Sequence, residues 1–311
     1  MNYKRYGLNG NPYHLGEFQI GDVNCFEQVH PIDEKALEAS ISEAMAKGIP
    51  LSYVITGISG SGRTALARYL VSVYDKLMAR DVLPTNRIAH YQRDHDGNGS
   101  GRQVAREVLK GLAGKVKLLG ADLKDGPVKD ILEGMKGLSA DYSAQDLQDM
   151  AGDFSAHVHG LGASFTCLVE DVPNVEVFRT VRSMLANTKG LLVCTLVTEQ
   201  RQAVLATLKS EQIGQEIVLA NLRDYRTCVL AEGRWEKCSA TPPLPFDVDG
   251  LKNAFHDNAR TVGRSLETLA FMIDSKLATY PGASLHPDDT GLLFDEQQIR
   301  NLIKLFDGLL K

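Results

Sequence analysis

Gly57-Ile58-Ser59-Gly60-Ser61-Gly62-Arg63-Thr64 is the stretch of the sequence on which the fold depends. It follows an apolar run, Leu51 to Ile55, and precedes a helical pattern from Ala65 to Leu77. A strand, a glycine-rich turn and a helix are the context in which backbone N–H groups close around a phosphate. The N-terminus of the following helix adds its positive end. The stretch therefore predicts a phosphate-binding loop.

The spacing within this loop is that of the Walker A pattern, with Arg63 where lysine is usual. Thr64 is placed to hold Mg²⁺ through its hydroxyl. The alternative is a glycine- and serine-rich turn that binds nothing. Gly57 and Gly62 at the spacing of the pattern, and the basic-hydroxyl pair that ends it, favour nucleotide binding, with ATP and Mg²⁺ as the expected ligands. The residues expected to contact the nucleotide are Gly57, Ser59, Gly60, Ser61, Gly62, Arg63 and Thr64.

Composition describes an ordinary globular protein. The 311 residues correspond to one large domain or two smaller ones, and 43% of them are hydrophobic. No apolar run approaches the roughly 20 residues of a membrane span, and Met1–Tyr6 has no apolar signal region behind it. The five cysteines are an odd number without a C-x-x-C pair. We therefore expect a cytoplasmic protein without membrane contact.

The net charge of −5 gives no general support for nucleic-acid binding. DNA remains a possible partner only through a local basic patch. Lysine and arginine are frequent from Arg102 to Lys136, but acidic residues lie between them. A solvated helix surface explains this pattern more simply than a docking surface does.

Strand and helix patterns alternate from Leu51 to Ala220, and the strand patterns are apolar on both faces. Such strands predict an α/β fold with a parallel sheet covered on both sides. After Leu222 only helical patterns follow. We therefore expect an N-terminal arm and helix over 1–48, a nucleotide-binding core over 49–222 and a helical domain over 223–311. The expected strands are Leu51–Thr56, Arg87–Tyr91, Ser164–Val169, Leu191–Val197 and Glu216–Ala220.

Two carboxylates, Glu170 and Asp171, end the strand pattern that begins at Ser164. Ligands of open α/β sheets bind at the carboxyl ends of the strands. In a Walker B pair the first carboxylate holds Mg²⁺ and the second orients the attacking water. The usual order is Asp then Glu, so here Glu170 takes the metal position and the shorter Asp171 the water position. An acidic pair that merely closes a strand is the alternative.

Thr195 and Thr198 lie at the end of the next strand pattern. Their hydroxyls are placed to sense the γ-phosphate or to hold the water. Only their position supports these roles, because strand ends commonly carry such residues.

The combination of these elements resembles the AAA+ P-loop ATPases, in particular the branch of origin-recognition initiators, transposition regulators and STAND-type NTPases. The opening Tyr6-Gly7-Leu8 with Asn11-Pro12-Tyr13 is also similar to the start of ExeA-type secretion ATPases. The AAA+ resemblance extends from about Leu51 to Leu277. It implies a five-stranded parallel core, a C-terminal helical lid, nucleotide bound between them, and homo-oligomers with sites at subunit interfaces.

The resemblance also implies a lid arginine that touches the phosphates. His256-Asp257-Asn258-Ala259-Arg260 stands in the place of the family signature, which makes Arg260 the match and Arg264 the second choice. A solvated arginine at a helix start is the alternative.

Three departures from the family pattern concern hydrolysis. Arg63 replaces lysine, the two carboxylates are reversed, and the stretch 209–215, where an arginine finger is usual, holds Lys209 but no arginine. The substitutes without a motif are Arg179, Arg182 and Arg201.

The sequence therefore favours an ATP-binding, slowly hydrolysing protein that acts as a nucleotide-controlled assembly switch with a protein partner. A nucleotide-binding scaffold with little turnover and a DNA-associated regulator are the alternatives.

Overall fold

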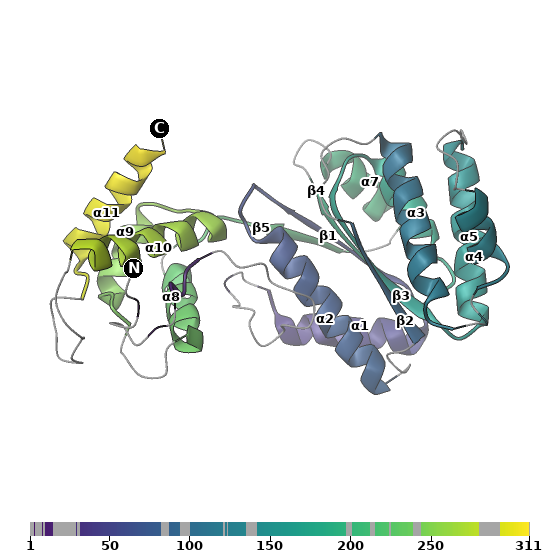
Figure 1. Ribbon diagram of the computed structural model, residues 1–311, viewed down its shortest axis with the longest axis horizontal. Coiled ribbons are helices and arrows are strands. Elements are labelled where there is room, and N and C mark those ends of the chain that lie inside the picture. The colour runs from purple at the N-terminus through teal and green to yellow at the C-terminus, as the bar shows by residue number, and fades with distance from the viewer. Residues whose placement is uncertain are drawn as a thin grey trace.

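Five parallel strands form the centre of the protein, shown as a computed structural model in Figure 1. The strand order is β2-β3-β4-β1-β5. Leu51 lies opposite Leu191, and Tyr53 lies opposite both Val193 and Gln215. The predicted parallel α/β fold is confirmed. The strands are β1 Leu51–Gly57, β2 Ile88–Arg93, β3 Ser164–Val172, β4 Leu191–Leu196 and β5 Gln215–Leu219.

The structure describes residues 3, 8, 10–14, 29, 32–81, 87–93, 100–120, 122, 124–134, 142–196, 201–211, 215–223, 225–238, 244–279 and 293–310.

The sheet is covered by helices on both faces because its central strands carry apolar side chains on both sides. Every residue of β4 is buried, as are the five central residues of β1. Helices α1 and α2 bury apolar side chains against one face, and α3 to α7 against the other. These helices are α1 Glu34–Lys47, α2 Arg63–Asp81, α3 Gly101–Lys117, α4 Pro127–Gly134, α5 Ala144–Gly160, α6 Val175–Ser183 and α7 Arg201–Glu211.

The last four helices form a group with its own core beside the β5 edge of the sheet (Figure 1). Its interior holds large apolar side chains such as Trp235, Phe255 and Leu269. The predicted helical C-terminal region is confirmed. Its helices are α8 Tyr225–Cys238, α9 Val248–His256, α10 Val262–Thr279 and α11 Glu296–Leu309.

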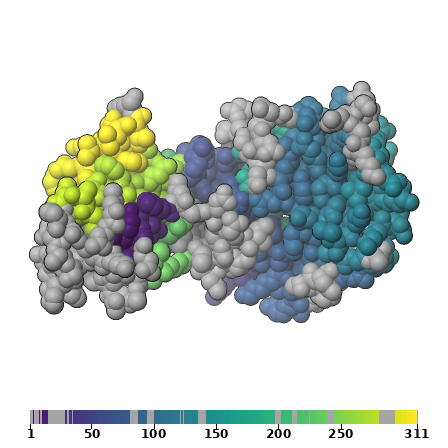
Figure 2. Space-filling model, viewed as in Figure 1, coloured from purple at the N-terminus to yellow at the C-terminus, as the bar shows by residue number. Residues whose placement is uncertain are grey.

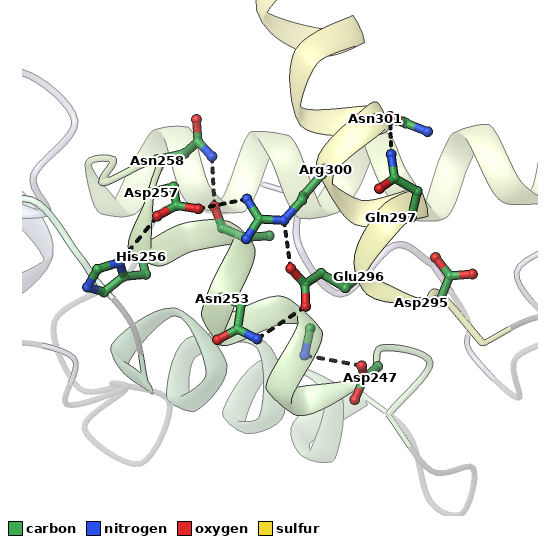
Figure 3. Close-up of polar contacts among 12 residues, drawn as sticks. Asp247, Asn253, His256, Asp257, Asn258, Asp295, Glu296, Gln297, Arg300 and Asn301 are labelled. Atoms are coloured by element: carbon green, nitrogen blue, oxygen red, sulfur yellow. Dashed lines mark hydrogen bonds and ion pairs between the residues drawn. The ribbon is translucent and has the colours of Figure 1, made fainter.

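A polar network joins α9 to the beginning of α11 (Figure 3). Arg300 donates to Asp257 at 2.8 Å and to Glu296 at 2.7 Å. Glu296 also accepts from Asn253 at 3.1 Å. Together with the buried Ile299, these contacts fix the first turns of α11 on α9.

Described residues of the N-terminal arm lie in the helical group. Leu8 and Tyr13 are buried in the core of that group. The Tyr13 hydroxyl donates to the carbonyl of Ala231 at 3.0 Å, and Asn11 Nδ2 donates to Asp274 at 2.9 Å. Figure 2 shows the purple N-terminal residues among the green and yellow C-terminal ones.

Asp75 of α2 carries a largely buried carboxylate that faces His90 of β2. Its Oδ1 has no hydrogen-bond partner among the described residues, and its Oδ2 lies 3.4 Å from Nδ1 of His90 on β2. Burial raises the pKa of Asp75 to about 7. Burial, and then the charge of Lys115 on α3, lower the pKa of His90. His90 is therefore neutral near pH 7 and does not offset the cost of an ionised Asp75.

The raised pKa predicts a stability that falls with increasing pH. The folded state holds the Asp75 proton up to about pH 7, whereas the unfolded state releases it near pH 4. Stability is therefore lost as pH rises from about 4 to about 7. We expect Asp75→Asn to raise the free energy of unfolding by about 2 kcal/mol at pH 8 and by much less at pH 4.5. Urea unfolding at both values tests this, with Asp122→Asn as the surface control. An equal pH dependence in Asp75→Asn and wild type would contradict it.

Candidate nucleotide site

The loop between β1 and α2 has a backbone that requires its glycines. Gly60 has a φ of 76° and Gly62 a φ of 91°, in the left-handed region that side chains disfavour. A Cβ on Gly57 would lie 2.5 Å from Ser61 Oγ. The Ser61 N–H donates to the carbonyl of Ile58 at 3.1 Å, which closes the turn. The loop thus curls over the N-terminus of α2.

The two residues predicted to hold Mg²⁺ lie together. Thr64 Oγ1 on α2 donates to Glu170 Oε2 on β3 at 3.2 Å. The other oxygen, Oε1, lies 3.8 Å from Nη2 of Arg68, and the side chains of Arg68 and Glu170 are 8% and 13% exposed. Sequence reasoning missed Arg68. The signal for it was a charged residue within the apolar run Leu66-Ala67-Arg68-Tyr69-Leu70.

Arg63 joins the loop to the ends of two strands. Its Nη1 donates to the carbonyl of Leu196 on β4 at 2.5 Å and lies 2.9 Å from Asp171 Oδ1 on β3. The Arg63 side chain is 17% exposed and the Asp171 side chain 21%. Since both contacts with described residues use Nη1, the donors Nε and Nη2 are available to a phosphate within this part of the structure.

A bulge explains how two consecutive carboxylates face the same site. Side chains along a regular strand alternate between faces. The register of β3 against β4 shifts between Val169 and Val172, and Asp171 has a φ of 47°, the only positive value at a non-glycine among the described residues. Bulges commonly redirect a side chain beside an active site. Here the bulge lets Glu170 contact Thr64 while Asp171 contacts Arg63.

Thr195 supports this bulge. Its Oγ1 accepts from the Asp171 N–H at 2.7 Å and lies 3.4 Å from Asp171 Oδ1. Thr195 thus holds both the backbone and the carboxylate of Asp171. Thr198 lies outside the described residues, as does the side chain of Arg201.

The helical group touches the loop directly. The N–H of Gly263, in the first turn of α10, donates to the carbonyl of Gly60 at 2.8 Å. A Cβ built on Gly60 would lie 2.9 Å from Thr261 Oγ1. The structure brings the backbone beside Arg260 to the loop, but not its side chain, which pairs with Asp307 of α11.

The other arginines considered for phosphate contact lie elsewhere. Arg264 also pairs with Asp307. Arg179 and Arg182 are on α6, with Arg179 exposed. Their roles between subunits stay predictions.

The donor set fits a magnesium nucleotide. A hydroxyl and a carboxylate are oxygen ligands of the kind Mg²⁺ takes, and this ion usually completes its shell with water and substrate phosphates. Among the described residues no group of three or more His, Cys, Asp or Glu gathers as a metal site. None of the described helices is long and apolar enough to span a membrane.

No protein-family model matches the chain, and a search of curated proteins finds no match either. Solved structures do match in shape. The Aeropyrum pernix ORC2 protein in its ADPNP–ADP complexes has a TM-score of 0.58 at 12% identity, over 96% of this chain and 72% of that one. The chain has an AAA+ fold.

Two further solved structures share this fold. The ADP form of the same ORC2 protein has a TM-score of 0.54 at 13% identity, over 93% of this chain and 73% of that one. The Aeropyrum pernix ORC1 protein in complex with DNA has a TM-score of 0.51 at 14% identity, covering 91% and 68%. The AAA+ resemblance of the sequence is thereby confirmed at the level of the fold.

Proposed function

We propose that the protein binds ATP and ADP with Mg²⁺ at the loop Gly57–Thr64. The observation that carries this proposal is the convergence of Arg63 and Thr64 on Asp171 and Glu170. Loop and strand end supply basic, hydroxyl and carboxylate groups at the N-terminus of a helix, the combination that phosphoryl transfer requires. The ORC2 structures, solved with ADPNP and ADP or with ADP, support this reading.

The residue roles follow from these contacts. The loop N–H groups and Arg63 bind the β- and γ-phosphates, and Thr64 with Glu170 holds the metal. Bound Mg²⁺ would neutralise charge on the phosphates. Asp171 orients the water, Thr195 fixes Asp171, and Thr198 is retained as the predicted γ-phosphate contact.

We propose that hydrolysis is slow. Asp171 already accepts from Arg63 at 2.9 Å, so its carboxylate is shared between this cation and the water it must orient. If the pair does not open at all, the protein is the nucleotide-binding scaffold with little turnover.

The contact between α10 and Gly60 supports a switch. A nucleotide in the loop would lie beside Gly60, whose carbonyl accepts from the N–H of Gly263 on α10 at 2.8 Å. A change in the loop therefore alters how the helical group packs on it. We propose that this change controls homo-oligomer assembly and partner binding in the cytoplasm, with the chain divided at 48/49 and 222/223. The ORC1 structure with DNA leaves a DNA-associated regulator as the alternative, testable by a salt-dependent DNA titration.

Light scattering in different nucleotide states tests the switch. We expect the mass of the particle to increase at least twofold with ATP and Mg²⁺ and to remain that of a monomer with ADP. Only ATP supplies a γ-phosphate for the helical group to sense. Arg63→Ala is the control that should not respond. If the protein binds nucleotide but has the same mass with ATP and with ADP, the result would contradict the switch and favour the scaffold.

A further inference from the structure

Two arginines flank the segment that touches the phosphate-binding loop. Thr261 and Gly263 contact Gly60. Arg260 precedes this segment and Arg264 follows it. The backbone of Arg260 is fixed by paired hydrogen bonds with Leu222, at 3.2 Å and 2.6 Å. Both guanidinium groups are thus carried by backbone next to the loop.

Both arginines are bound by Asp307, near the end of α11. Arg260 forms a fork, with Nη1 at 2.9 Å from Oδ1 and Nη2 at 2.5 Å from Oδ2. Arg264 Nη2 lies 3.2 Å from Oδ1, and its guanidinium stacks 4.4 Å over the ring of Phe306. Its Nη1 also lies 3.5 Å from the half-exposed Glu267. The hydrogen bond from Arg260, and then the contact with Arg264, lower the pKa of Asp307. Asp307 is therefore ionised whenever the chain is folded near neutral pH.

This pairing leaves the buried cation incompletely satisfied. Arg260 is 8% exposed, and its Nη1 also donates to Thr268 Oγ1 at 3.2 Å. Its buried Nε has no hydrogen-bond partner among the described residues. Asp307 is 41% exposed, so water already reaches the acceptor. A carboxylate offers one fork to two arginines, whereas a triphosphate offers several oxygens and more charge.

The two ends of α11 are held differently. Its first turns are fixed by Arg300, Glu296 and the buried Ile299 (Figure 3). Its last turns expose Leu305 at 53% and Leu309 at 66%. In the described part of the chain, the polar contacts of these last turns with other elements run through Asp307. Apolar packing also holds this part of the helix, since the ring of Phe306 lies 5.2 Å from that of Phe271 on α10. A loss of the Asp307 contacts would therefore remove the ionic contacts of the last turns and leave this packing in place.

We propose that Asp307 is a positioning residue that withholds Arg260 and Arg264 from the nucleotide, and that the γ-phosphate competes with it for them. This inference rests on the proposed nucleotide site. In one arrangement Asp307 holds the two arginines, and in the other they are released to the nucleotide. ATP can shift the equilibrium between the two only by the difference between its affinities for them. The competition lowers the affinity for ATP and couples its binding to the end of α11.

Asp307→Asn tests the proposal by nucleotide titration. Removal of the charge weakens the hold on both arginines, and we expect ATP to bind about tenfold tighter than to wild type, since hydrogen bonds between charged groups contribute about 1.5–3 kcal/mol. The affinity for ADP, which lacks the γ-phosphate, should increase less than twofold. Asp307→Glu, which retains the charge, should restore affinity near that of wild type.

Asp257→Asn is the matched control. It breaks a carboxylate–arginine contact between α9 and α11, at 2.8 Å from Arg300, without touching Arg260 or Arg264. We expect ATP affinity within twofold of wild type. In Asp307→Asn combined with Arg260→Ala and Arg264→Ala, the gain should disappear.

Equal ATP affinity in wild type and folded Asp307→Asn would overturn the proposal, as would the same gain in Asp257→Asn. If Asp307→Asn fails to fold, Arg260→Lys keeps a cation but loses the fork. It should then bind ATP about threefold tighter than wild type, and an unchanged affinity would overturn the proposal. Failure of the nucleotide site is distinguishable, because neither wild type nor any of these variants would then bind ATP.

Discussion

Arg63→Ala is expected to weaken the binding of ATP and Mg²⁺ by about 100-fold or more. Charge-assisted contacts to a phosphate contribute about 1.5–3 kcal/mol. The substitution also leaves Asp171, which lies 2.9 Å from Nη1, without its cation and close to the incoming phosphates. Isothermal titration measures the affinity.

Arg87→Ala is the matched control for this variant. Arg87 forms a contact of the same length, 2.9 Å, with Asp122, but it lies immediately before β2, away from the loop. We expect its ATP affinity to equal that of wild type. If Arg63→Ala binds ATP as tightly as Arg87→Ala does, the loop is not the nucleotide site.

Asp171→Asn is expected to lower the rate of ATP hydrolysis by about 1,000-fold, because a positioned base contributes roughly 10²–10⁴. Asparagine is a suitable replacement since it tolerates a positive φ, here 47°. Binding should be unchanged or tighter, because Arg63 loses a competing anion. Single-turnover phosphate release measures the rate, and titration measures the affinity.

Glu176→Gln serves as the comparison for Asp171→Asn. It removes a carboxylate on α6 that pairs with Arg102 at 3.8 Å, and its hydrolysis rate should match that of wild type. If Asp171→Asn hydrolyses ATP at the wild-type rate, Asp171 does not orient the attacking water.

The sheet and the loop could be predicted from sequence because local patterns specify them. The apolar run Leu51–Ile55 indicates a strand buried on both faces, and the strand extends to Gly57. Gly60 and Gly62 adopt the backbone for which glycine is suited. The position of Glu170 at a strand end also followed from pattern alone, since parallel strands end at one edge.

The remaining contacts of the site depend on tertiary structure. The bulge at Asp171 arises from the pairing of β3 with β4 and the support of Thr195, which no local pattern reveals. The pairing of Arg260 with Asp307 joins residues 47 positions apart. A motif match places Arg260 at a helix start but contains no information about which anion its side chain faces.

The arm that packs in the helical group has a consequence for synthesis of the protein. Asn11 and Tyr13 contact Asp274 and Ala231, which lie 263 and 218 positions later in the chain. At the usual 5–20 residues per second, the ribosome needs on the order of 10 to 50 seconds to make that intervening chain. Until the helical group is made, Leu8 and Tyr13 have no native site, although β1 to β5 are all translated before Ala231 and Asp274 are. These apolar residues are thus made long before the helices that bury them, and exposed apolar surface of this kind is where misassembly begins.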